Sequence, residues 1–244
     1  VAPTVLVPVG GYTSGGKHHD CVQKIAHVAR ALPDLKQVVV VPLAGGRGRI
    51  DQIPGAVWWD GWLQGAAPRE APFERFAFNH PLYVLYSSGT TGVPKCIVHG
   101  AGGTLVQHLK EHQLHCDIRR DDRVFYFTTC GWMMWNWLVT VLASDAAIVL
   151  YDGSPIHPDG NRLFDLADRA GITLFGTSAK HIDLLRKAGL TPRTTHGLGS
   201  IGTITSTGSP LSAESFDFVY ASIKTDVHLA SISGGTDIVS CFVG

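Results

Sequence analysis

The sequence predicts an α/β fold with two subdomains, each a βαβ-type unit whose mainly parallel sheet is flanked by helices. Short apolar runs alternate with amphipathic segments of helix length along most of the 244 residues. This alternation is typical of parallel strands joined by crossover helices. The hydrophobic content of 45% is enough to bury a substantial core. Both observations favour a globular α/β protein.

The individual elements follow from local composition. Runs rich in Val, Ile, Leu and aromatic residues, bounded by Gly, Pro or Asp, predict strands. These runs lie at residues 4–8, 37–42, 82–86, 95–99, 123–128, 147–151, 172–176, 200–207 and 226–231. Segments whose apolar residues recur every three or four positions predict helices. These segments lie at residues 20–32, 102–115, 133–143, 161–170, 178–188 and 211–222.

A domain boundary is expected where this alternation lapses. Residues 43–81 are rich in Gly, Pro and Trp and show little periodicity. We therefore predict a partial first α/β subdomain at 1–78 and a second at 79–244, which ends before its sheet is complete. The ends of the chain, Val1 and an apolar run stopping at Gly244, suggest a segment of a longer protein.

Charge and cysteine content limit the partners and the compartment. The 20 basic and 20 acidic side chains balance, so the sequence favours no nucleic-acid partner. The cysteines form no CxxC pair, which favours free thiols and a cytoplasmic location. They are Cys21, Cys96, Cys116, Cys130 and Cys241.

One stretch, residues 132–151, has the length of a membrane span. Asn136, Ser144 and Asp145 interrupt its apolar character. We expect no membrane span, but a buried helix that turns near Asp145 into a buried strand.

Two motifs offer alternatives that the sequence does not favour. Gly11–Lys17 satisfies GxxxxGK, the pattern of a P-loop NTPase, but His18 stands where that motif needs a Ser or Thr to bind magnesium. We favour a glycine-rich surface turn. The sequence His108 to His112 spells H-x-x-E-H, a pattern of some zinc peptidases. Its neighbours Gln107, Lys110 and Gln113 favour a solvated helix face instead.

The segment YSSGTTGVPK at residues 86–95 resembles the phosphate-binding loop of the adenylate-forming superfamily of acyl-CoA synthetases and luciferases. Apolar strands flank it on both sides, and its Pro-Lys ending makes a chance match rare. Thr207–Pro210 and Gly235–Asp237 follow in the order in which that superfamily carries its adenine turn and its Gly/Gln-Thr-Glu triplet. The resemblance implies the fold of the N-terminal domain of these enzymes.

A longer likeness narrows the family. Residues 99–137, the lead-in that begins at Gly15 and the tail SISGGTDIVSCFVG resemble the branch of cytosolic ligases that activate acetoacetate. The resemblance implies attack of the acetoacetate carboxylate on the α-phosphate of ATP, with Mg²⁺ bound, to give an acyl-adenylate and pyrophosphate. Coenzyme A then displaces AMP. Such catalysis depends mainly on fixed donors and a metal ion.

The resemblance also assigns roles to residues of the motifs. The phosphate loop would bind the β- and γ-phosphates through Ser87, Ser88, Gly89, Thr90, Thr91 and Gly92. Thr90, Lys95 and Thr236 would be the catalytic residues, although Lys95 suits a structural role at the strand start as well. Asp237, which replaces the usual Glu, would hold Mg²⁺, directly or through a water. The adenine would pack on Gly208, Ser209 and Pro210.

The acyl pocket is expected to be larger than in acetate-activating relatives. A tryptophan closes the pocket in those relatives, and Gly234 stands at the matching position. The added space, lined by Trp132, Met133, Met134 and also Asn136, suits an acid longer than acetate. These apolar residues suit a plain helix core equally well.

The sequence lacks matches to several downstream parts of these enzymes: the ribose-binding aspartate, the hinge and the lysine of the small C-terminal domain. We therefore expect negligible turnover from this chain alone. A P-loop NTPase using Gly11–Lys17 and a non-catalytic nucleotide-binding module are the alternatives.

Overall fold

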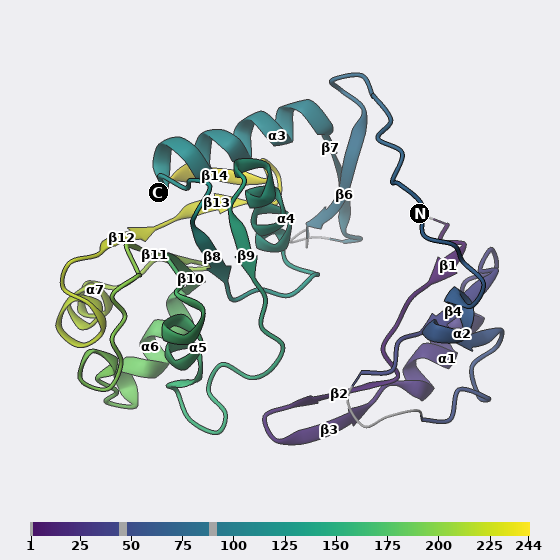
Figure 1. Ribbon diagram of the computed structural model, residues 1–244, viewed down its shortest axis with the longest axis horizontal. Coiled ribbons are helices and arrows are strands. Elements are labelled where there is room, and N and C mark those ends of the chain that lie inside the picture. Colours follow the sequence, from purple (N-terminus) through teal and green to yellow (C-terminus); the bar gives the residue numbers. More distant parts are fainter. Residues whose placement is uncertain (1, 44–47, 88–91) are drawn as a thin grey trace. The chain divides into compact units, whose positions relative to one another are not determined.

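The computed structural model describes residues 2–43, 48–87 and 92–244, which form two compact units (Figure 1). The first unit runs to Phe73 and includes Ile156–Pro158. The second comprises Glu74–Pro155 and Asp159–Gly244. The predicted domain boundary at residue 78 stays a prediction.

The first unit contains a three-stranded parallel sheet in the order β1 (Val5–Leu6), β4 (Gln37–Val40), β5 (Ala56–Trp58). Helix α1 (Val22–Arg30) buries its apolar face against this sheet. The predicted βαβ unit is therefore present. Strand β5 and the short helix α2 (Trp59–Leu63) lie in the region without periodicity, where we predicted no element.

Gly11–Lys17 belongs to an antiparallel hairpin rather than to a phosphate loop. Strand β2 (Gly11–Ser14) pairs with β3 (Lys17–Asp20), and Ser14 is in register with Lys17. The turn between them needs the positive φ angles of Gly15 (58°) and Gly16 (75°), which glycine adopts without strain. A P-loop requires a helix directly after its lysine, but Lys17 begins a strand. The expected glycine-rich turn is confirmed, and the P-loop alternative is not supported.

The second unit is built on a five-stranded sheet in which every pairing is parallel. Its order is β12 (His228–Ser231), β11 (Thr203–Thr207), β10 (Leu174–Ser178), β8 (Arg123–Tyr126), β9 (Ala147–Val149). Four of these strands fall within the predicted runs, and β10 begins within the run at 172–176 but continues two residues further, to Ser178. The mainly parallel α/β class is confirmed.

Helices cover both faces of this sheet. Successive side chains of a strand point to opposite faces, so each strand contributes to a core on either side. Phe125 faces the core formed with helices α5 (Arg162–Ala170), α6 (Ala179–Lys187) and α7 (Ala213–Phe218). Val124 and Tyr126 face the core formed with α4 (Met133–Thr140). Short helical turns η2 (Val141–Ser144), η3 (Pro192–Thr194) and η4 (Val219–Ile223) complete the unit.

Local signals explain where several helices begin and end. Ser178 accepts a hydrogen bond from the backbone N–H of His181 and caps α6, and Ser212 caps α7 in the same way. Gly171 ends α5 at a φ of 62°. In the stretch 132–151, the chain turns at Asp145, as predicted, between η2 and β9. Within the described part of the chain, no helix has the length and apolar character that a membrane crossing needs.

A hairpin, a long helix and a second small sheet complete this unit. Strands β6 (Pro81–Ser87) and β7 (Lys95–Gly100) are antiparallel, with Ser87 opposite Lys95. Helix α3 (Ala101–Lys110) follows directly and continues as a π-helical turn, η1 (Glu111–His115). Strands β13 (Ser233–Gly235) and β14 (Ser240–Val243) form an antiparallel pair beside α3 (Figure 1). This last pair was not predicted.

Candidate functional site

A cavity of about 340 Å³ lies in the second unit. Segments far apart in the sequence line it, among them the end of η1, the start of α4, the turn after β11, and β13 with the residues that follow. Eight residues with predicted site roles line this cavity: Trp132, Met133, Met134, Gly208, Ser209, Pro210, Gly234 and Thr236. The structure thus brings together the predicted adenine turn, the predicted acyl pocket and part of the triplet.

The turn after β11 is anchored at its start. Thr207 Oγ1 donates a hydrogen bond of 2.9 Å to the carbonyl oxygen of Ile232. Gly208 then takes a φ of 92°, which a side chain rarely allows. The turn lies at the carboxyl end of β11, an inner parallel strand, and ligands of open α/β sheets bind at such strand ends.

The start of α4 forms the apolar wall of the cavity. Trp132 is the extended residue before the helix, and its ring lies edge-on to Tyr126 with centroids 6.0 Å apart. Met134 is 5% exposed and also belongs to the core beneath the sheet. Asn136 does not line the cavity; its carbonyl oxygen accepts a hydrogen bond from Thr140 within the helix.

One hydroxyl group on the cavity wall has no hydrogen bond among the described residues. Thr205, on β11, is 1% exposed and lines the cavity, yet its Oγ1 makes no hydrogen bond. The hydroxyl of Tyr126 donates instead to the carbonyl oxygen of Thr177. Burial raises the pKa of this phenol, while the nearby Thr205 hydroxyl partly opposes that rise. Thr205 therefore places a buried hydroxyl beside this phenol, at the wall of a largely apolar space.

Gly234 does not open the cavity in the way that the sequence suggested. A Cβ atom at this position would lie 2.1 Å from the carbonyl oxygen of Ser240 and 2.5 Å from Cys241 Cα. The side chain that glycine lacks would therefore point into the backbone of β14. The close pairing of β13 with β14 requires glycine here. An acyl pocket enlarged relative to acetate-activating relatives stays a prediction.

The predicted triplet lies at the rim of the cavity. Thr236 lines the cavity, whereas Asp237 is exposed and does not. A short turn follows, in which Val239 N–H donates to the carbonyl oxygen of Thr236. Across residues 2–43, 48–87 and 92–244, no group of three or more His, Cys, Asp or Glu residues could by itself hold a metal ion.

The predicted phosphate loop joins the two strands of the β6–β7 hairpin. Ser87 ends β6, Gly92 has a φ of 112°, and Lys95 begins β7 with its side chain exposed. None of these three residues lines the cavity. Four members of the loop, Ser88, Gly89, Thr90 and Thr91, lie outside the described residues. The two strands flank this segment in the predicted order.

A buried carboxylate, which the sequence interpretation missed, lies at the wall of the cavity. Glu111 Oε1 accepts hydrogen bonds from Ser240 Oγ, from the backbone N–H of Cys241 (3.1 Å) and from Gln107 (2.9 Å). Its Oε2 accepts one from Trp137 Nε1 (2.9 Å). Burial would raise the pKa of Glu111, but these donors outweigh it and lower the pKa. The carboxylate is therefore ionised.

The expectation of solvated histidines on this helix was wrong. His108 and His112 are both fully buried, and Glu111 is 4% exposed, whereas Leu105 and Leu114 are exposed. His108 Nδ1 lies 3.0 Å from Thr140 Oγ1, and its Nε2 lies 2.7 Å from the carbonyl oxygen of Val239. On this helix the polar residues are buried and leucines are exposed. The polar composition of the segment therefore predicted the wrong face as solvated. Within the described residues, His108, Glu111 and His112 therefore do not form a zinc site.

Two thiols border the same end of the cavity. Burial raises the pKa of Cys116 to about 12 and that of Cys241 to about 11. Both are therefore protonated thiols at neutral pH, and the nearby Glu111 carboxylate reinforces this state. All five cysteines are free, as predicted.

Comparisons with known proteins agree with the geometry. The model of a family described as AMP-binding enzyme matches residues 3–242. The acetoacetyl-coenzyme A synthetase of Rhizobium meliloti is 56% identical over 244 residues, which is all of this chain and 37% of the relative. The acetoacetyl-CoA synthetase of Gallus gallus is 51% identical over 249 residues, again 37% of the relative.

A solved structure gives the same result. The acetoacetyl-CoA synthetase from Streptomyces lividans superimposes with a TM-score of 0.89 at 45% identity and covers 99% of this chain. The chain spans 37% of that structure. The matched family model, which extends over nearly the whole sequence, shows that this chain belongs to the AMP-binding enzyme family.

Proposed function

We propose that the protein containing this chain is an AMP-forming ligase that activates acetoacetate with ATP and transfers the acyl group to coenzyme A. The observation that carries the proposal is that the start of α4, the turn after β11 and the triplet segment all line one cavity. The relatives and the solved structure named above are called acetoacetyl-CoA synthetases. We assign the protein to the cytoplasm.

The residues of this chain suit the first step, in which the acid and ATP form the acyl-adenylate. Gly208, Ser209 and Pro210 would pack on the adenine, and the loop from Ser87 to Gly92, with Thr90 and Lys95, would hold the phosphates. Thr236 would contact the α-phosphate, where the acid carboxylate attacks and pyrophosphate leaves. Fixed hydroxyl and N–H donors stabilise the charge that develops there.

The exposed carboxylate of Asp237 fits a magnesium ion that arrives with the nucleotide. Such an ion is usually bound by one or two carboxylates together with phosphate oxygens and waters, so a single carboxylate at the rim suffices. When bound, Mg²⁺ neutralises phosphate charge during the attack.

The acyl group would occupy the apolar end of the cavity, beside Trp132, Met133 and Met134. Thr205 supplies a buried hydroxyl, next to that of Tyr126, at the wall of this space. Acetoacetate carries a 3-oxo group, and the Thr205 hydroxyl can donate a hydrogen bond to it. A wall that offers such a donor favours an oxo acid over its apolar analogue.

An ATP–pyrophosphate exchange assay of the full-length protein against acids of two to six carbons tests the proposal. We expect acetoacetate to give the highest kcat/KM. Butyrate has the same chain length without the oxo group and is the matched comparison. The variant Thr205→Val should narrow the preference for acetoacetate over butyrate by about tenfold, because the site then has no donor for the oxo group.

Two outcomes would contradict parts of this account. If acetate exceeded acetoacetate in kcat/KM, the assignment of the acid would be wrong. If Thr205→Val left the acetoacetate-to-butyrate ratio unchanged, the role of the hydroxyl would be wrong while the reaction class remained.

A further inference from the structure

Three side chains hold the segment Thr236–Cys241, which we call the triplet turn. His99 Nε2 lies 2.9 Å from the carbonyl oxygen of Thr236. His108 Nε2 lies 2.7 Å from that of Val239. Glu111 Oε1 accepts a hydrogen bond of 3.1 Å from the backbone N–H of Cys241. The turn is thus held at its start, its middle and its end by residues from β7, α3 and η1.

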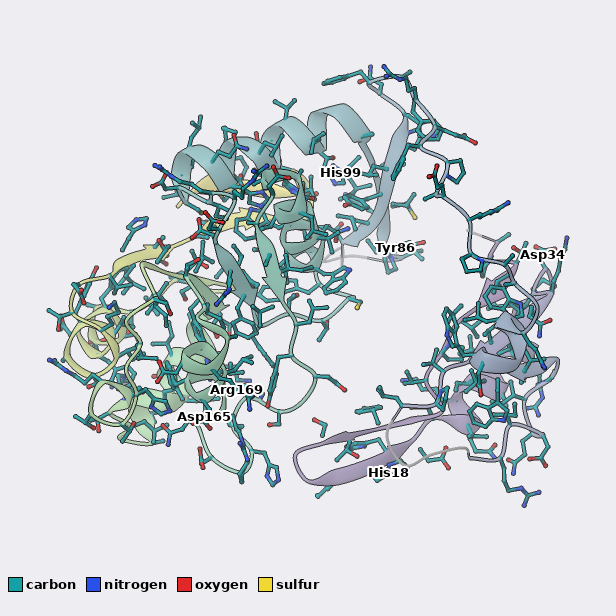
Figure 2. The ribbon with its side chains drawn as sticks, viewed as in Figure 1. His18, Asp34, Tyr86, His99, Asp165 and Arg169 are labelled. Atoms are coloured by element: carbon teal, nitrogen blue, oxygen red, sulfur yellow. The ribbon has the colours of Figure 1, made fainter. Side chains whose placement is uncertain are left out.

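The donors and acceptors of these contacts are fixed by chemistry. A carbonyl oxygen only accepts hydrogen bonds, so both imidazoles donate through Nε2. Burial lowers the pKa of His108, which is therefore neutral, and its Nδ1 lies 3.0 Å from Thr140 Oγ1, whose one proton is shared between this nitrogen and the carbonyl oxygen of Asn136. Both ring nitrogens of this buried side chain are therefore used. His99, labelled in Figure 2, lies on β7 below α3 and comes from the strand that follows the phosphate loop.

The triplet turn contains a strained residue. Val239 has a φ of 49°, a left-handed conformation that a β-branched residue rarely adopts. Its side chain is 2% exposed, and its carbonyl oxygen is the one that His108 binds. Such conformations persist only where surrounding contacts over-determine them, and they cluster at functional sites. The strain lies two residues after Asp237.

We propose that His99, His108 and Glu111 are positioning residues that hold Thr236 and Asp237 in the geometry required to bind magnesium and ATP. This inference rests on the proposed function. These side chains act through the backbone of the triplet turn. His99 and His108 do not line the cavity, and Glu111, at its wall, has both carboxylate oxygens bound by donors of the protein. His99 also ties β7, the strand that begins at Lys95, to Thr236.

Variants of the full-length protein test this inference. His108→Leu removes the donor to Val239, whereas His108→Gln keeps an N–H at a similar reach. His112→Leu is the matched control: His112 is equally buried on the same helix, makes no side-chain hydrogen bond and does not line the cavity. ATP–pyrophosphate exchange at varied ATP and Mg²⁺ gives the KM for the nucleotide, and varied acid gives the KM for the acid.

We expect His108→Leu to lower kcat/KM for magnesium-bound ATP by about ten- to a hundredfold, because small misplacements of reacting groups are costly. The KM for the acid should stay within about twofold. His108→Gln should recover most of the loss, and His112→Leu should behave like the wild type.

Equal losses in His108→Leu and His112→Leu, or no recovery in His108→Gln, would overturn the inference. Because loss of a buried donor can prevent folding, His99→Phe and His99→Gln at the half-buried position give a second, independent pair with the same expected contrast. Acetoacetate-dependent exchange by the wild type tests the proposed function. The ratio of variant to wild type, measured with whichever acid the wild type uses, tests the positioning role.

Discussion

Gly234 shows how a single residue can support the family resemblance yet have a different physical role from the one the sequence suggested. Its position in the triplet segment was identified correctly, and it does line the cavity. The direction of its missing side chain, toward Ser240 and Cys241, depends on the pairing of β13 with β14. No local pattern of the sequence predicts this short pair, so the steric reason for glycine was not predictable.

We predict that Gly234→Ala destabilises the protein whereas Gly235→Ala does not. A Cβ atom at Gly234 meets backbone at 2.1 Å, while one at Gly235 meets only the Asp237 carboxylate at 3.9 Å. Backbone cannot rotate away, so β14 must move. Thermal unfolding of the two full-length variants should give a lower Tm for Gly234→Ala alone. Equal Tm values would show that β14 is not closely paired here.

At the scale of elements, the helix made of α3 and η1 departs most from the expectation. Its polar residues His108, Glu111 and His112 are buried, while Leu105 and Leu114 are exposed. The sequence predicted the helix itself correctly, because periodicity along the chain is a local property. It could not predict which face is buried, since some polar partners of that face lie 26 and 32 residues later and others 130 and 131 residues later, in the triplet turn.

This helix makes stability depend on pH through His112. Burial lowers the pKa of His112 from 6.5 to about 4, and neither ring nitrogen has a hydrogen-bond partner. Between pH 6.5 and pH 4, His112 is protonated in the unfolded state but stays neutral in the folded state. The contribution of His112 to the free energy of unfolding should therefore be constant above pH 6.5. It should fall by about 3 kcal/mol as the pH decreases toward 4.

The variant His112→Leu removes this titration without changing the shape of the helix greatly. Its Tm should fall less between pH 7 and pH 5 than that of the wild type, measured by thermal unfolding at both pH values. His108 and Glu111 remain in the variant, so their contributions are common to both proteins. A wild-type Tm no more sensitive to this pH change than the variant's would contradict the burial of a neutral imidazole.

At the scale of the whole molecule, the parallel sheet and its covering helices followed from the alternation of apolar runs with amphipathic segments. The meeting of Trp132, Gly208 and Thr236 at one cavity followed only from the motif order of the family, since contacts over such distances leave no local signal. The hairpin at Gly11–Lys17 shows the converse, because a formal motif match has no function without its structural context.

The products formed from ATP test the central claim most directly. The full-length protein, supplied with acetoacetate, coenzyme A and ATP, should form AMP and pyrophosphate in an acid-dependent manner. Lys17→Ala should keep this activity, because Lys17 is an exposed hairpin residue, whereas Thr90→Ala in the proposed phosphate loop should lower it. Acid-independent formation of ADP and phosphate, lost in Lys17→Ala and kept in Thr90→Ala, would contradict the account.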